Sequence, residues 1–152
     1  MDQPRKSPQP PLLFFACLLA GWGMGHLHPL ELPLPVPLRF SLAALFLLLA
    51  GLLGLWGLAT FKRHHTTHRP NGVASALLTT GPFRLSRNPL YLGLACLLAA
   101  FGFGMDSAWL LGLTLLLVLL LDRLVIAREE VRLRAQFGET YLAYTRRVRR
   151  WF

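Results

Sequence analysis

Four long apolar runs constrain the fold of this chain more than any other feature. They cover residues 12–27, 40–61, 90–105 and 109–127 of a sequence of 152 residues. As α-helices, at about 1.5 Å per residue, runs of these lengths span about 24–33 Å, which suits a hydrocarbon core of about 30 Å. A mean hydropathy of +0.47, with only 15% charged residues, excludes an ordinary soluble domain. The sequence therefore predicts an all-α, polytopic membrane protein with four transmembrane helices.

The basic residues alternate between the two ends of these helices. Two precede the first run, five lie between the second and third, and seven follow the fourth, whereas the two opposite loops contain only Arg39. This alternation follows the positive-inside pattern and predicts an integral membrane protein with cytoplasmic N and C termini. The formal net charge of +9 then reflects topology and contact with membrane lipid, so we expect no nucleic-acid partner.

The fourth apolar run does not end cleanly. It passes through Asp122 and continues as an amphipathic helix to about Gln136, with Gly138 as the expected stop. In an ideal α-helix Asp122 and Glu129 share one face, and Glu130 lies on the adjoining stripe. A charge inside an apolar helix costs about 2.5–3.5 kcal/mol near the membrane centre, so Asp122 requires a partner or a water-filled cavity.

The rest of the chain fits one integral membrane domain over residues 1–152. Residues 1–61 hold the two N-terminal transmembrane helices, and residues 62–152 hold the functional half. We expect the basic segment 139–152 to be a C-terminal amphipathic helix at the membrane interface.

The loops and the cysteines suggest no metal chemistry. Three histidines lie between residues 64 and 68, but no carboxylate or cysteine accompanies them in that basic loop, so we expect no metal site. Cys17 and Cys96 fall inside predicted helices, and their spacing indicates neither a disulfide framework nor a zinc site. Asp106 and Ser107 predict a tight turn in which either side chain can cap the fourth helix.

Two polar segments border the apolar runs. The first, residues 79–93, reads TTGPFRLSRNPLYLG, and the second is the Arg-Glu-Glu run at 128–130. Because ionisable groups beside a membrane core are costly, they mark a functional site by default. We interpret the two segments as halves of one site.

Structural roles account for only part of the first segment. Asn88 can cap the third helix, and Pro89 can occupy its first position. Arg87, Tyr91 and Gly93 remain, clustered at one end of that helix. An arginine beside a helix N-terminus suits an anionic group, and a glycine one turn into the helix lets a flat ligand approach the backbone.

The order of these motifs resembles a known family. Gly-Pro-aromatic-Arg, Arg-Asn-Pro-x-Tyr-x-Gly, Glu-Glu, Phe-Gly-Glu and Tyr-x-x-Tyr follow one another between residues 66 and 151. Together they resemble the isoprenylcysteine carboxyl methyltransferase family and the related phospholipid N-methyltransferases. The short bacterial-type members look most similar, which implies location in a bacterial inner membrane.

The resemblance implies that residues 62–152 surround S-adenosylmethionine and that a lipid-like small molecule reaches it from the membrane. Carried over by motif position, it assigns catalytic or acceptor-orienting roles to three residues, Arg87, Arg128 and Glu130. It implies cofactor contacts at a larger set: His68, Ser75, Ala76, Leu77, Leu78, Gly81, Phe83, Asn88, Pro89, Leu90, Tyr91, Gly93, Glu129, Tyr141 and Tyr144.

Three departures from the family pattern leave the acceptor open. Asn88 replaces the usual histidine, Phe83 replaces a tyrosine, and Val125 stands where eukaryotic carboxyl methyltransferases have an arginine that contacts the substrate. The expected function is S-adenosylmethionine-dependent O-methylation of an isoprenylcysteine-like carboxylate. Methylation of a phospholipid amine, an NADPH-dependent membrane reductase and a non-catalytic membrane scaffold are alternatives, and the oligomeric state stays open.

Overall fold

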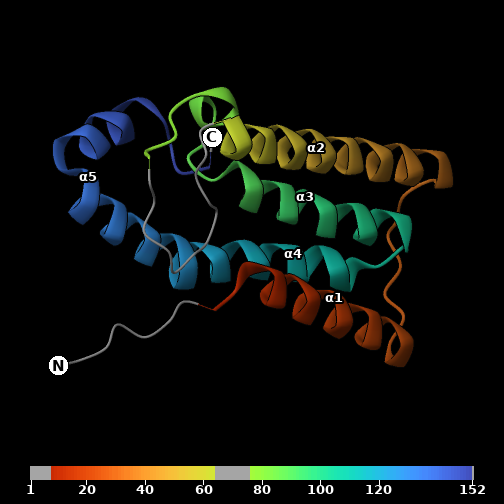
Figure 1. The fold of residues 1–152 in the computed structure, drawn as a ribbon. Helices are drawn as coiled ribbons and strands as arrows, with labels where there is room; N and C mark the ends of the chain where they lie inside the picture. Colours follow the sequence, from red (N-terminus) through yellow and green to blue (C-terminus); the bar gives the residue numbers. More distant parts are fainter. Residues whose placement is uncertain (1–7, 64–75, 152) are drawn as a thin grey trace, which may run out of the picture.

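The computed structural model describes residues 8–63 and 76–151, and all the regular structure within these ranges is helical (Figure 1). The expectation of an all-α chain is therefore confirmed for the described residues. In chain order, the elements are α1 (Pro10–Leu27), α2 (Val36–Arg63), the 3-10 turn η1 (Gly81–Arg84), α3 (Pro89–Gly104), α4 (Ala108–Leu120), the π-helical turn η2 (Leu121–Ile126) and α5 (Ala127–Arg147).

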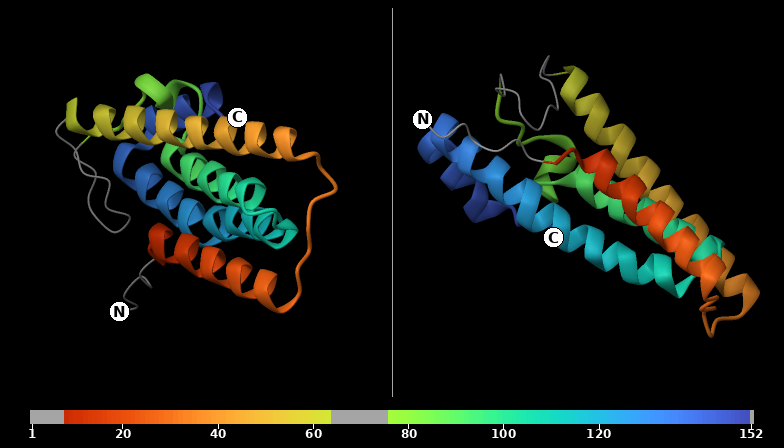
Figure 2. Two further views of the ribbon diagram at one scale, coloured as in Figure 1. Left: turned by 90° about the vertical axis from the view of Figure 1, so that its right-hand side faces the viewer. Right: turned by 90° about the horizontal axis from the view of Figure 1, so that it is seen from below.

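The long helices run side by side as an antiparallel bundle. Helix α3 packs against both α2 and α4, while α1 packs on α4, so α1 and α2 lie on opposite sides of the α3–α4 pair (Figure 2). Helices α4, η2 and α5 form one rod that extends beyond the bundle (Figure 1). The backbone of this rod breaks at Gly138, where φ is 50° and ψ is −127°, a conformation suited to glycine. The glycine predicted to stop the helix is therefore the point at which the chain turns back.

Among the described residues, three helices are long and apolar enough to cross a membrane: α1 with 18 residues, α2 with 28, and the rod Ala108–Arg147 with 40. Helix α2 buries only Gly57 and Thr60, and it exposes large apolar side chains such as Leu55, 72% exposed. Such a surface suits contact with lipid rather than water. The protein is a polytopic membrane protein, as predicted. Helix α3 has only 16 residues, so the fourth crossing and the cytoplasmic location of both termini stay predictions.

The core of the bundle lies between α1, α3 and α4. Leu98, Leu110 and Leu117 are fully buried there, and Phe14 of α1 packs against them. Small residues allow this close approach: a Cβ atom added at Gly102 would lie 2.5 Å from Leu111 Cδ2. Cys17 and Cys96 are buried, free thiols, as the sequence indicated.

At one end of the bundle, the turn between α3 and α4 meets the loop between α1 and α2. Asp106 pairs with Arg39 and accepts a hydrogen bond from Leu32 N at 2.9 Å. Its φ of 56° is a left-handed conformation that aspartate tolerates better than most residues. Ser107 caps α4, because its Oγ accepts from Leu110 N at 3.4 Å. Asp106 therefore closes the loop, and of the two predicted caps Ser107 is the one observed.

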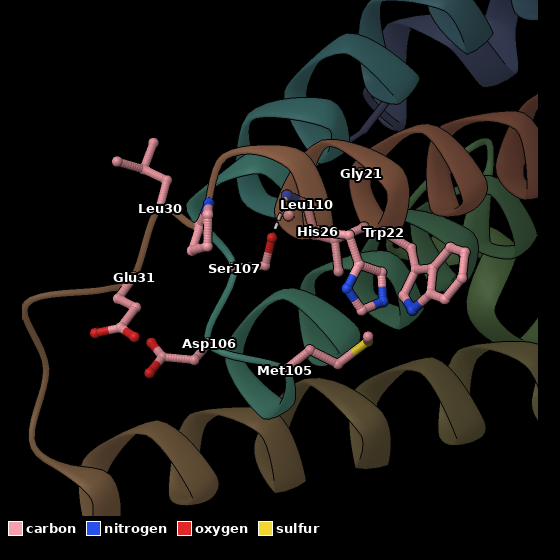
Figure 3. Close-up of a pocket in the computed structure, with 11 residues that line it drawn as sticks. Gly21, Trp22, His26, Leu30, Glu31, Met105, Asp106, Ser107 and Leu110 are labelled. Atoms are coloured by element: carbon pink, nitrogen blue, oxygen red, sulfur yellow. Dashed lines mark hydrogen bonds between the residues drawn. The ribbon is translucent and has the colours of Figure 1, made fainter.

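A pocket of about 220 Å³ opens at this loop end. Its lining includes Trp22 and His26 of α1, and the acidic residues Glu31 and Asp106 (Figure 3). The polar segments singled out from the sequence are not among its lining residues, because they lie at the opposite end of the bundle.

Candidate functional site

The two halves of the predicted site meet at the end of the bundle where α3 begins. Tyr91, in the first turn of α3, is 2% exposed, and its hydroxyl donates a hydrogen bond to Glu129 Oε2 at 3.0 Å. This contact joins residues that are 38 positions apart. The spatial prediction that the two segments form one region is therefore confirmed.

A second contact between the same segments involves opposite charges. Arg87 Nη1 lies 3.0 Å from Glu130 Oε1, and the side chains are 14% and 10% exposed. The same nitrogen donates to the hydroxyl of Tyr141 at 3.3 Å. A buried charge requires such partners, because removing one leaves an uncompensated charge at high cost.

Asp122 finds its partner in Arg150, at the far end of the chain. Arg150 Nη1 donates to both carboxylate oxygens of Asp122 at 3.1 Å, and the indole nitrogen of Trp151 donates to Oδ1 at 3.0 Å. The adjacent Arg123 is 80% exposed and 3.8 Å away. The charge placed in an apolar helix is therefore compensated by residues about 30 positions later in the chain.

Arg150 also binds Glu130 through both of its oxygens. Its Nε lies 3.0 Å from Oε1 and its Nη2 lies 2.5 Å from Oε2, a bidentate arrangement. Hydrogen bonding to Glu130, and then to Asp122, raises the pKa of the Arg150 guanidinium, so this group stays charged. Arg150 thus links the π-helical turn η2 to the first turn of α5.

The π-helical turn explains why Asp122 faces Glu130 rather than Glu129. An i→i+5 turn is wider than an α-helical turn and adds about one residue before the next face is reached. Glu130 therefore follows Asp122 on the same side of the rod, while Glu129 is rotated toward Tyr91. The expectation that Asp122 and Glu129 share one face is wrong, because it assumed an uninterrupted α-helix.

The backbone of the C-terminal residues 148–151 lies against the start of α3. Arg87 N donates to Arg149 O at 3.1 Å, while Ser86 Oγ and Asn88 Nδ2 donate to Arg150 O at 3.2 and 3.0 Å. Asn88 occupies the N-cap position and Pro89 the start of the helix, as predicted, but the Asn88 side chain makes no capping bond. Its amide group holds the C-terminal segment instead.

The helical prediction for 139–152 is correct only to Arg147, because Val148 is extended.

The η1 turn lies between α2 and the last part of α5. Tyr144 Oη donates to Phe83 O at 2.6 Å, and the Phe83 ring meets Phe61 edge-on at 5.6 Å. Gly81 has a φ of 60°, and a Cβ atom there would lie 2.7 Å from Thr60 Oγ1. This conformation and this closeness to α2 explain the glycine structurally.

The remaining predicted site residues lie on α3 and α5, and those on α3 face different neighbours. Leu90 and Gly93 lie toward α2: a Cβ atom added at Gly57 would meet Leu90 at 2.8 Å, and one added at Gly93 would lie 3.5 Å from Ala50 O. Gly93 therefore lets α3 approach α2, and Tyr91 points the other way, toward α5. Arg128 is half-buried, and its carbonyl accepts from Arg132 Nε at 3.4 Å.

The segment before η1 is described only in part. Leu78 is buried, and Ala76 and Leu77 are half-buried. His68 and Ser75 lie outside the described residues, as do the histidines considered for metal binding. Within 8–63 and 76–151, no group of three His, Cys, Asp or Glu side chains could hold a metal ion.

Sequence reasoning missed Arg150, Trp151 and Ser86. The unpaired Asp122 signalled that a cation must come from elsewhere, but seven basic residues follow the fourth apolar run and no periodicity selects one of them. Val125, where related enzymes have an arginine, is fully buried in the core, so the guanidinium near this turn comes from Arg150.

Comparison with known proteins gives the family. A family model described as "Phospholipid methyltransferase" matches residues 38–140, from α2 into α5. An "Uncharacterized protein" of Haemophilus influenzae is 39% identical over 64 residues, which are 41% of this chain and 98% of that protein. No solved structure matches. Because the matched region is well over half of the chain and contains both halves of the site, this protein belongs to the phospholipid methyltransferase family and is a membrane-associated methyltransferase.

Proposed function

We propose that this protein transfers a methyl group from S-adenosylmethionine to a membrane-embedded amphiphile, which Arg87 holds by an anionic group. Members of this family use S-adenosylmethionine as the methyl donor and act on lipid-type acceptors. Family membership favours a methyltransferase over the reductase and scaffold interpretations. The contact between Tyr91 and Glu129 carries the proposal, because it joins the two motifs that the resemblance assigns to cofactor binding.

The side chains at this contact have the chemistry that S-adenosylmethionine requires. A half-buried carboxylate such as Glu129 can accept hydrogen bonds from ribose hydroxyls or from the cofactor's ammonium group, and Tyr91 holds it in position at 3.0 Å. When bound, the cofactor supplies a methyl group on a positively charged sulfur. The protein's own contribution is to place donor and acceptor in line and to exclude water, which can account for much of the rate.

Arg87 is the group best placed to hold the acceptor. Its Nε is buried and has no hydrogen-bond partner among the described residues, so one donor of this guanidinium is left unsatisfied. A guanidinium binds carboxylates and phosphates in a fixed, often bidentate geometry. An acceptor that ends in a carboxylate, or a phospholipid with its phosphodiester, supplies such a group.

A carboxylate acceptor, as in isoprenylcysteine-like compounds, fits the surroundings of Arg87 most simply. An ionised carboxylate needs no base before it accepts a methyl group, whereas an ammonium group must first lose a proton. Both oxygens of Glu130 already accept hydrogen bonds from Arg150, so Glu130 balances charge and is poorly placed to take that proton. The description of the matched family favours the second candidate, a phospholipid amine.

One labelling experiment separates these acceptors. The full-length protein in lipid nanodiscs is incubated with methyl-labelled S-adenosylmethionine and either N-acetyl-S-farnesylcysteine or phosphatidylethanolamine vesicles. A methyl ester releases labelled methanol in alkali, whereas a methylated amine retains the label. We expect volatile label from the farnesylcysteine compound; label retained in phospholipid would select the amine, and transfer to neither would refute the proposed acceptor chemistry. Arg84→Ala, at an exposed arginine of the same segment, is the matched control for Arg87→Ala.

A further inference from the structure

The C-terminal segment 148–151 forms a strap across the start of α3. Its position is fixed by main-chain groups: the carbonyl of residue 149 accepts from Arg87 N, and that of residue 150 accepts from Ser86 and Asn88. These bonds do not depend on the side chains at 149 and 150. They nevertheless fix where the Arg150 side chain begins, and it enters between Asp122 and Glu130.

The strap brings Arg150 to Glu130, a carboxylate that Arg87 also contacts. Arg150 Nε and Arg87 Nη1 both lie 3.0 Å from Glu130 Oε1, and Arg150 Nη2 takes the other oxygen at 2.5 Å. Arg150 holds Glu130 by two bonds, whereas Arg87 reaches it by one. The Nε of Arg87 is left without a partner in the described part of the chain.

Removal of the Arg150 side chain would change the hydrogen bonds between Glu130 and Arg87. Glu130 would have both oxygens open to Arg87, and arginine and carboxylate prefer a bidentate pair. That pair would use Nε of Arg87 together with an Nη, the same fork that an anionic acceptor needs. We infer that Arg150 is a positioning residue: by binding Glu130 and Asp122, it keeps the Arg87 guanidinium available for the acceptor's carboxylate or phosphate.

This inference rests on the proposed function, in which Arg87 binds the acceptor, and it makes a prediction that a structural clamp does not. A clamp that only holds α3 to α5 would affect cofactor binding, acceptor binding and thermal stability together. Positioning of Arg87 affects the acceptor selectively. It is also reversed when Glu130 loses its charge, because no carboxylate is then left to capture Arg87.

The kinetic test uses the full-length protein in nanodiscs with N-acetyl-S-farnesylcysteine and, in a second arm, phosphatidylethanolamine. For Arg150→Ala we expect the KM for the methylated acceptor to rise about tenfold, while the Kd for S-adenosylhomocysteine stays within about twofold. Adding Glu130→Gln to Arg150→Ala should lower this KM again, and Arg150→Lys, which keeps one charge but not the fork, should be intermediate. Arg149→Ala is the matched control, because Arg149 precedes Arg150, its side chain is exposed, and its main-chain carbonyl, which the variant retains, accepts the bond from Arg87 N.

A second measurement needs no activity. Exchange of the Arg87 Nε–H with solvent, followed by ¹⁵N NMR in detergent micelles, should slow about tenfold in Arg150→Ala and recover in the double variant. Unchanged exchange, or equal losses of acceptor and S-adenosylhomocysteine binding without recovery, would overturn the positioning role. Failure of the proposed function is distinct, since the unmodified protein would then methylate neither acceptor.

Discussion

The two ends of the bundle each contain a charged network, and the networks are built differently. At the loop end, Arg39 and Asp106 form one pair, and the second oxygen of Asp106 binds a main-chain amide. At the other end, two acids and two arginines bind one another, beside three tyrosines. The first network closes a loop. The second joins α3, η2, α5 and the C-terminal strap.

A buried arginine nitrogen without a described partner occurs at both ends, on Arg39 and on Arg87. Such an atom therefore does not by itself mark a site. The difference lies in the surroundings: Arg87 lies in the segment that contains Tyr91, where the two motifs of the family meet, whereas Arg39 serves the connection between helices. Contact between distant segments does not separate the ends either, because Asp106 also binds residues far away in the chain. What distinguishes the candidate functional end is that both family motifs meet there.

The largest expected effect is the difference in kcat/KM between alanine variants of Arg87 and Arg39. We expect Arg87→Ala to lower kcat/KM about a hundredfold, because a hydrogen bond to a charged group contributes about 1.5–3 kcal/mol and Glu130 also loses a partner. Arg39→Ala should lower the thermal unfolding temperature while kcat/KM stays within about twofold. Steady-state kinetics and thermal unfolding of both variants measure this. Equal losses of kcat/KM would remove the distinction between the two ends.

A smaller effect is expected at the cofactor side of the site. Tyr91→Phe removes the hydroxyl that donates to Glu129 and should weaken binding of S-adenosylhomocysteine about two- to tenfold, as loss of one hydrogen bond of about 0.5–1.5 kcal/mol predicts. Glu129→Gln should weaken it further, since the charge is lost. Isothermal titration calorimetry in detergent gives these values.

The matched control for Tyr91→Phe lies on the same helix. Leu97→Val shortens a side chain that packs against the apolar core and should leave S-adenosylhomocysteine binding unchanged. Undiminished affinity in both Tyr91→Phe and Glu129→Gln would contradict the assignment of this contact to the cofactor.

The interaction between Asp122 and Arg150 tests stability rather than binding. Asp122→Asn should lower the free energy of unfolding by about 1–3 kcal/mol, because the hydrogen-bonding groups of Arg150 and Trp151 lose a charged acceptor. Arg123→Ala, beside it and 80% exposed, should change little, since exposed ion pairs contribute little. Reversible unfolding in mixed micelles measures both. Equal changes would mean that Arg123, and not the strap, compensates Asp122.

Much of this architecture could be predicted from the sequence because it depends on local signals. Apolar runs gave the helices, Gly138 gave the break in the rod, and motif order brought Tyr91 and Glu129 together. These signals require only neighbouring residues or a family pattern. The sequence prediction fails at η2. One wide turn there brings Glu130, rather than Glu129, to the side of Asp122, and apolar periodicity does not reveal such a turn.

The strap could not be predicted for a different physical reason. Its position depends on main-chain carbonyls of residues 149 and 150, and every residue has such a group, so no side-chain pattern indicates it. Arg150 also looks like its basic neighbours until the tertiary fold places it between Asp122 and Glu130. The sequence shows that Asp122 needs a partner, but only the tertiary fold identifies Arg150 as that partner.

The smallest expected effects compare the starts of α3 and α4. Ser107→Ala removes an observed cap and should cost about 1 kcal/mol of unfolding free energy without changing kinetics. Asn88→Ala removes no cap, since the Asn88 side chain holds Arg150 O at 3.0 Å. It should therefore loosen the strap and raise the acceptor KM about two- to threefold, at a similar or smaller cost in stability. Unfolding and kinetic measurements on the two alanine variants decide between these roles, and an effect of Asn88→Ala on stability alone would mean that the strap is fixed without its amide.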